Sequence, residues 1–394
     1  MLRKIGTLNF LNQFAYGALT VTLPLYLISR GIDVGEIGLV LSLLPLAFLL
    51  VRIVSSVFAD VLGVKKFFIA SNIFSTITSV VFAVAGTPLQ FGIGRICEGA
   101  SSAFFWAVDR TAIMARSHAR KYLTVMGIVR SFGTALGLVG AGLLIAYLSF
   151  EAVFALLFVL GILGVVVALA LVNRGATLKK PDWKTMFSIR KRQLDFWHVS
   201  AAVVLVNISF VLLFTFLLPV MMDIDMGMSY LEIAVMLTAF YVSIGMGGLL
   251  SVRMKMDERR LLFFQAMAIP MIIALPVSGP YFSAVLMLAG FGFGVCFGLN
   301  EAMIGYLVES GRGVSSRIAM LMAPLNIFQF LALAGAGFAL EAFGNEAMFV
   351  FSAILLGGFV ILGKKINSDF DGKKKKEIIE YHPHRGPVSA QAAK

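Results

Sequence analysis

The chain has 394 residues, of which 59% are hydrophobic and 14% are charged, whereas an average soluble domain is about 45–50% apolar and about 25% charged. This composition, together with a mean hydropathy of +0.92 and a formal net charge of +12, excludes an ordinary soluble protein. Apolar runs of about 20 residues, long enough to cross a bilayer, recur along the whole length. The sequence therefore predicts an all-α membrane protein with many transmembrane helices.

Breaks at charged residues, proline and glycine divide the chain into twelve predicted transmembrane helices. They cover residues 5–28, 36–59, 67–86, 91–114, 122–147, 152–172, 198–222, 231–252, 261–279, 282–307, 318–340 and 347–363. We expect one six-helix bundle in 1–172, a cytoplasmic central loop in 173–197 and a second six-helix bundle in 198–363. The basic residues of 364–394 predict a disordered cytoplasmic tail.

The lysines and arginines are distributed unevenly between the loops that connect these helices. If alternate loops lie on alternate sides of the membrane, 28 of the 33 basic residues fall in the loops and ends of one side. The loops of the other side contain Arg30 alone. The positive-inside rule then predicts that both termini lie in the cytoplasm and that the protein is a multi-pass protein of the cell membrane. Because topology explains the positive charge, we expect no nucleic-acid partner.

The two halves of the chain repeat short sequences at one constant offset of 195 residues. LPLYL at 23–27 matches LPVMM at 218–222, GAG at 140–142 matches GAG at 335–337, and FEAVF at 150–154 matches NEAMF at 345–349. A constant offset at three separate places predicts two pseudo-symmetric halves in the same orientation.

Three motifs within this repeat resemble signatures of the major facilitator superfamily. The loop ADVLGVKK at 59–66 carries Asp60, Gly63, Lys65 and Lys66, although Val61 stands where a basic residue is usual. GRICEGAS at 94–101 resembles the fourth-helix signature of an Arg four residues before a Gly. GTALGLVGAG at 133–142 resembles the glycine-rich fifth-helix motif of the drug:proton antiporter branch, without its proline.

The resemblance covers the chain to about residue 365 and implies the two-bundle fold of that superfamily. It implies that the first, fourth, seventh and tenth helices line a central cavity and that transport is often coupled to protons. It also implies a gating role for the loop residues, which are Asp60, Gly63, Lys65 and Lys66.

Polar and aromatic side chains share one face of the same four helices, at the spacing of an α-helix. An ionised group at the bilayer centre costs about 2.5–3.5 kcal/mol, so such a face must meet protein or water. We predict a substrate cavity lined by Asn9, Asn12, Gln13, Tyr16, Thr20, Ser102, Phe105, Trp106, Asn207, Phe210, Phe214, Phe293, Phe297 and Asn300. The alternative for the aromatic members is ordinary core packing.

Arg95, Glu98 and Glu301 are the candidates for proton coupling. Arg95 and Glu98 lie three residues apart on one helix face, within reach of each other. In one interpretation they form a neutral pair that only pins the helix. In the other, Glu98 binds a proton whenever Arg95 or substrate releases it. Glu301, in the tenth helix, is the second carboxylate that could serve.

Two arginines outside the fourth helix also need partners in an apolar environment. Asp109, near the cytoplasmic end of the fourth helix, either forms a gating ion pair with Arg130 of the fifth helix or belongs with Arg110 to a solvated helix end. Arg52 of the second helix is expected to pack at an interface and not to bind substrate. The glycines of the fifth helix either serve plain helix packing or close an exporter tightly.

These observations predict a secondary active transporter of small organic molecules that works by alternating access, coupled to protons, with export preferred. The alternatives are a proton-coupled importer of a sugar, carboxylate or other metabolite, and a non-transporting membrane sensor on the same fold. An enzyme or an ATP-driven pump is disfavoured because the sequence contains no nucleophile with a base, metal cluster or phosphate loop. We expect a monomer in the lipid bilayer with no cofactor and no metal.

Overall fold

The computed structural model describes residues 2–114, 119–171, 194–253, 258–307 and 314–381. Each predicted transmembrane segment falls within a helix, apart from a few terminal residues. The first half consists of α1 (Leu2–Ser29), α2 (Val34–Leu62), α3 (Val64–Val84), α4 (Pro88–Met114), α5 (Ala119–Tyr147) and α6 (Phe150–Leu169). Most of the predicted central loop, 173–197, lies outside the described residues.

The second half begins with α8 (Leu194–Val211), which continues through a π-helical stretch (Leu212–Leu217), α9 (Leu218–Val220) and a second π-helical stretch (Met221–Asp225). Pro219 lies in the short helix between the two wider turns. The remaining helices are α10 (Tyr230–Arg253), α11 (Glu258–Ala274), α12 (Phe282–Leu307) and α13 (Val314–Tyr381).

Helix α13 joins the last two predicted transmembrane helices across a bend at Gly344, whose φ of 78° is a backbone conformation that favours glycine. The helix then continues through residues 364–381, where we had expected disorder. The stretch before Pro383 contains the helix formers Lys and Glu and no proline, which is compatible with this helix. The rest of the predicted tail lies outside the described residues.

Short polar side chains define where several helices begin. The hydroxyl of Ser149 accepts a hydrogen bond from Ala152 N at 3.3 Å and so caps α6. Ser229 and Glu232 form a reciprocal capping box before α10, in which Ser229 N donates to the Glu232 carboxylate at 2.8 Å and Glu232 N donates to the Ser229 hydroxyl at 3.4 Å. These caps place the ends of the helices that the apolar pattern alone leaves uncertain.

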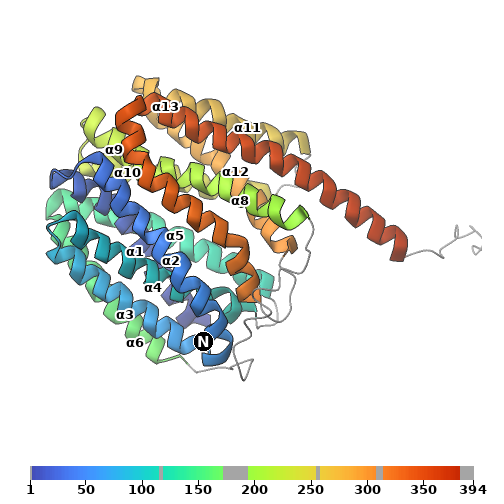
Figure 1. The fold of residues 1–394 in the computed structure, drawn as a ribbon, viewed down its shortest axis with the longest axis horizontal. Coiled ribbons are helices and arrows are strands. Elements are labelled where there is room, and N and C mark those ends of the chain that lie inside the picture. The colour runs from blue at the N-terminus through green and yellow to red at the C-terminus, as the bar shows by residue number, and fades with distance from the viewer. Residues whose placement is uncertain (1, 115–118, 172–193, 254–257, 308–313, 382–394) are drawn as a thin grey trace, which may run out of the picture.

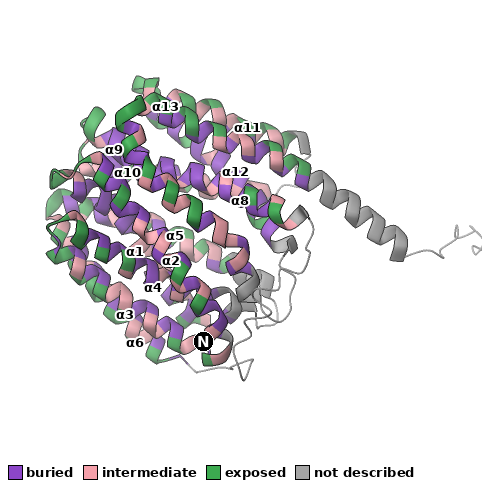
Figure 2. Cartoon of the chain, viewed as in Figure 1, coloured by how far each residue is buried: buried purple, intermediate pink, exposed green. Residues whose placement is uncertain are grey.

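Among the described residues, nine helices are long and apolar enough to cross a membrane. One of the nine is the stretch Ile318–Ile366, which includes the bend in α13. Helices α1 and α4 are not among them, and they carry the polar stripes noted in the sequence. Many large apolar side chains are exposed, including Val84, Phe263 and Ile361, and exposed positions lie along the outer helices in Figure 2. An apolar exterior of this kind is expected of a protein surrounded by lipid.

The helices of the first half lie together on one side of the molecule and those of the second half on the other (Figure 1). Within the first half, α1 packs on α5, α2 on α4, and α3 on α4 and α6. Within the second half, α10 packs on α12, α11 on α12, and α13 on α8. The halves meet where α2 packs on α13 and where α5 packs on α10.

The GAG repeat marks both places where the halves meet. A Cβ added to Gly142 of α5 would collide with Ala234 of α10. A Cβ added to Gly337 of α13 would collide with the carbonyl of Val34 and would lie 2.6 Å from the Cα of Gly35, both at the start of α2. The last glycine of each repeated GAG therefore allows close backbone contact between the halves.

Candidate functional site

The charged pair of α4 is buried in protein. Arg95 Nη1 donates to Glu98 Oε2 at 2.7 Å, and the two residues are 6% and 8% exposed. Arg95 Nη2 also donates to the carbonyl of Leu41 in α2 at 3.3 Å. The structure thus brings together the two residues that the sequence pairs and buries both of them within the protein.

A polar cavity lies beside this pair within the first half. Its walls come from α1, α3, α4 and α6, and it has a volume of about 40 Å³. The lining residues are Asn12, Gln13, Ala15, Tyr16, Leu19, Ser75, Thr78, Ser79, Glu98, Ser101, Ser102, Trp106 and Leu157. Glu98 therefore belongs both to the buried ion pair and to the lining of the cavity.

Six of the predicted site residues line this cavity, namely Asn12, Gln13, Tyr16, Glu98, Ser102 and Trp106. Others from the same helices have different surroundings. The hydroxyl of Thr20 donates to the carbonyl of Tyr16 at 2.8 Å. Phe105 is 1% exposed and packs edge-on against Phe68, with ring centroids 5.4 Å apart.

The aromatic residues predicted from the seventh and tenth helices pack on one another. The ring of Phe210 lies 5.0 Å from that of Phe214, 5.9 Å from that of Phe293 and 5.1 Å from that of Phe297. Phe240 of α10 joins the same cluster. Phe214 and Phe293 are fully buried, so in this form of the protein they pack as core residues do.

The polar candidates of the second half do not reach the cavity of the first half. The amide of Asn207 donates to the carbonyl of Val203 at 2.8 Å. Asn300 is buried with an unpaired side-chain oxygen, and Glu301 is exposed. The two carboxylates proposed for coupling thus have very different surroundings.

A closed hydrogen-bonded network links α1, α4 and α5. Arg130 forms an ion pair with Asp109, which is fully buried. Asn9 Nδ2 donates to Asp109 Oδ1 at 2.7 Å, while Arg130 Nε donates to Asn9 Oδ1 at 2.7 Å. The guanidinium also lies 4.9 Å from the ring centroid of Trp106. The structure therefore contains the ion pair between Asp109 and Arg130 and adds Asn9 to it.

Four hydroxyl residues of the cavity were not predicted. Ser75, Thr78 and Ser79 come from α3, and Ser101 comes from α4. The available signal was the series Ser71, Ser75 and Ser79, spaced by four residues in an apolar helix. Three of these hydroxyls donate to backbone carbonyls of α3: Thr78 to Phe74 O at 2.8 Å, Ser79 to Ser75 O at 3.0 Å and Ser101 to Ser71 O at 2.8 Å.

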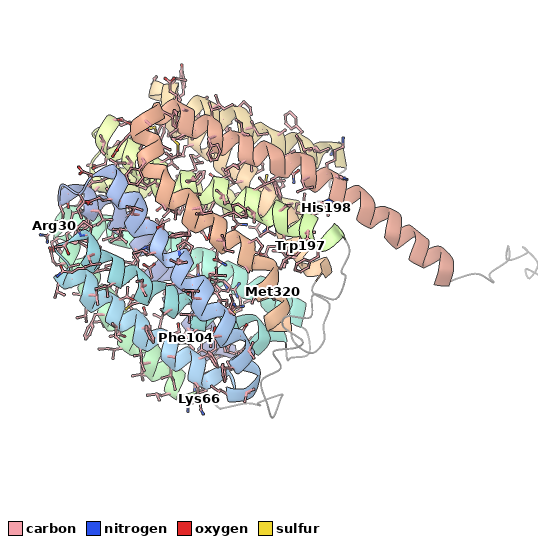
Figure 3. All side chains as sticks on the ribbon, viewed as in Figure 1. Arg30, Lys66, Phe104, Trp197, His198 and Met320 are labelled. Carbon is pink, nitrogen blue, oxygen red and sulfur yellow. The ribbon has the colours of Figure 1, made fainter. Side chains whose placement is uncertain are left out.

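The loop motif after the second helix forms the sharp connection between α2 and α3. Gly63 has a φ of 78° and ends α2 by donating its N–H to the carbonyl of Ala59 at 3.2 Å. Lys65 is partly buried and Lys66 is exposed, whereas the side chain of Asp60 lies outside what the structure describes. Figure 3 shows Lys66 and Arg30 at opposite ends of the first-half helices. Arg52 is buried in α2 and does not line the cavity.

Comparison of the fold with solved structures identifies transporters. The structure of the nucleoside transporter NupG matches with a TM-score of 0.68 and 16% identity, over 94% of this chain and 98% of that one. A bacterial homologue of the human lysosomal transporter Spinster, in an inward-facing and unoccupied conformation, matches with a TM-score of 0.73 and 14% identity, over 93% and 96%. At these identities the likeness is one of fold alone.

The sequence comparison gives the family. Residues 5–315 match the Major Facilitator Superfamily. The chain belongs to this superfamily and is a membrane transporter, not an enzyme. It is also similar to the putative multidrug resistance protein MdtD of Salmonella paratyphi B and of Salmonella typhi, with 29% identity over 109 residues. That match spans 27% of this chain and 23% of the relative, so it covers about a quarter of each protein.

Proposed function

We propose that the protein is a secondary active transporter that exports small organic molecules in exchange for protons. The observation that carries this proposal is the buried pair of Arg95 and Glu98, with Glu98 lining a polar cavity between α1, α3, α4 and α6. A buried carboxylate that can exchange its arginine partner for a proton is a suitable coupling group. The partial similarity to a putative multidrug resistance protein supports export.

We propose that the chain crosses the membrane twelve times with both termini in the cytoplasm. The nine apolar spans support this number, with α1 and α4 added as crossings whose polar faces are sheltered by neighbouring helices, and with α13 crossing twice about its bend at Gly344. The positions of Lys66 and Arg30 at opposite ends of the first half support the orientation (Figure 3).

Alternating access is supported by contacts between the halves at the end that contains Arg30. Besides the two glycine contacts, the ring of Phe150 in α6 lies 5.3 Å from that of Tyr230 in α10. The carboxylate of Glu341 in α13 accepts a hydrogen bond from Gly35 N in α2 at 3.1 Å. In our proposal this end faces the outside, and these contacts close it in the form observed and separate when substrate leaves.

The roles of individual residues follow from their surroundings. Glu98 carries the proton, and Arg95 neutralises it in the unprotonated form. Asn12, Gln13, Tyr16, Ser102 and Trp106 face the polar space next to this pair and contribute to substrate binding once the halves rearrange. Asp109 and Arg130 hold α1, α4 and α5 together, so that these helices move as one unit when the gate opens.

Flux in proteoliposomes tests the proposed function. A panel of labelled organic cations, neutral drugs, sugars and nucleosides is offered to vesicles with an imposed pH gradient, with and without a protonophore. We expect the uptake of at least one compound into vesicles with an acidic interior, and its loss when the protonophore is added. If no transported compound responds to the pH gradient, proton coupling is refuted. If uptake occurs only into vesicles with an acidic exterior, the result would favour import together with protons.

A further inference from the structure

The cavity beside Glu98 has the size of a few water molecules. A buried site needs at least about 10–15 Å³ of such space to hold one water, so a volume of about 40 Å³ accepts on the order of one to three. An organic substrate of more than a few heavy atoms would not fit. In the form observed, the ligand that the space can accept is water.

The walls of the cavity complement water in hydrogen-bonding character. On the α3 and α4 side, Thr78, Ser79 and Ser101 each donate their hydroxyl hydrogen to a backbone carbonyl, at 2.8, 3.0 and 2.8 Å. Their oxygens therefore present lone pairs to the cavity. On the α1 side, the amides of Asn12 and Gln13 and the phenol of Tyr16 offer donors. A water molecule both donates and accepts, and it requires two to four such partners.

Glu98 is the titratable acid that this space touches. One of its oxygens, Oε2, is bonded to Arg95, and the residue itself lines the cavity. The titratable groups that face it are Arg95 from its own helix and Tyr16 from α1, and the lining residues include no Lys, Arg or His. Water here would reduce the cost of burying the carboxylate.

All of the lining residues belong to the first half of the chain. We infer that, in the form observed, the cavity is a hydration site within the first half that exchanges protons with Glu98, before the halves rearrange and its α1 and α4 residues contact substrate. When the site loads, a hydronium ion gives its proton to a Glu98 carboxylate oxygen, so that one O–H bond breaks, one forms and neutral water remains. The reverse step discharges the site. This inference rests on the proton coupling of the proposed function and adds a route for the proton.

Filling the cavity while keeping the protein intact tests the inference. Ser75 is partly buried, so Ser75→Leu can fill the space, and Ser75→Ala is the matched control that leaves room for water. We expect Ser75→Leu to lower gradient-driven flux by about tenfold or more, with substrate counterflow in the absence of a gradient within about twofold of wild type. Ser75→Ala should retain both activities. Full gradient-driven flux in Ser75→Leu would overturn the inference.

Hydroxyl-radical labelling of the wild-type protein gives a readout that does not depend on transport. Radicals produced from bound water should modify Tyr16 and Trp106, which line the cavity, faster than the core residues Phe105 and Phe293, after correction for intrinsic reactivity. Labelling of Tyr16 and Trp106 no faster than that of the two phenylalanines would show a dry cavity and overturn the inference, even if Ser75→Leu does not fold. If the cavity is wet but no compound shows gradient-driven flux, the proton coupling fails and the hydration site stands.

Discussion

The contact between α2 and α13 predicts that alanine substitution has very different effects at the two glycines of the GAG triplet in α13. A Cβ on Gly337 would lie 2.6 Å from the Cα of Gly35, whereas a Cβ on Gly335 would have no atom within 4 Å. Relief of the first contact requires the two helices to separate by about 1 Å, since carbon atoms pack at about 3.5–4.0 Å. Overpacking of this kind costs about 1–3 kcal/mol. Because that cost is paid only in the closed form, Gly337→Ala should lower the closed population relative to the open one by about 5-fold to 150-fold.

Thiol labelling measures this shift. Ser42 is 1% exposed and lies four residues after Gly38, on the face of α2 that meets α13, so Ser42→Cys is a small change at a closed position. In a background with Cys97→Ala and Cys296→Ala, a membrane-impermeant maleimide added outside should react faster in Gly337→Ala than in Gly335→Ala. Equal labelling rates in the two variants would refute the claim that this contact closes the outer end.

Three further predictions concern packing in the two halves, each measured by thermal unfolding of the purified protein. Asp109→Asn should destabilise the protein by about 3–5 kcal/mol because Arg130 would lose its ionised partner, and adding Arg130→Gln should recover part of the loss; a single variant as stable as wild type would contradict this. Phe210→Ala should cost about 3–5 kcal/mol because its ring packs against four others of the cluster; unchanged stability with weaker substrate binding would favour the cavity role instead. Trp106→Leu should lower the stability by about 1–2 kcal/mol through the lost contact with Arg130, in addition to the loss of apolar packing by the ring. In an Arg130→Gln background only the packing loss should remain, so an equal loss of stability in both backgrounds would contradict the contribution of this contact.

The helices and the charged pair could be predicted from the sequence because each rests on a strong local signal. An apolar run of 20 residues has few alternatives to a membrane-spanning helix. A carboxylate in such a run must have a nearby partner, and Arg95 is one helical turn from Glu98. The repeat offset predicted two related halves, and the glycines that it aligned, Gly142 and Gly337, both lie where the halves meet.

The exact lining of the cavity could not be predicted because it depends on which helix lies opposite which. Ser75 and Ser79 are compatible with an apolar environment, since a serine hydroxyl can bond to a carbonyl of its own helix, as Ser79 does. Asn9 has the same spacing as the cavity residues of α1, yet it contacts Asp109 and Arg130. Aromatic residues at helical spacing fit a cavity or a core equally well, and only the packing of α10 against α12 separates the two for Phe293.

The most direct test of proton coupling compares two carboxylate variants in the same flux assay. Glu98→Gln keeps the size of the side chain and removes its proton exchange, and Glu301→Gln makes the same change at an exposed position of α12. For a compound whose transport by the wild-type protein is driven by the pH gradient, we expect Glu98→Gln to abolish gradient-driven flux while retaining counterflow. Full gradient-driven flux in Glu98→Gln would contradict the role of Glu98, and full flux in both variants would contradict coupling through either carboxylate.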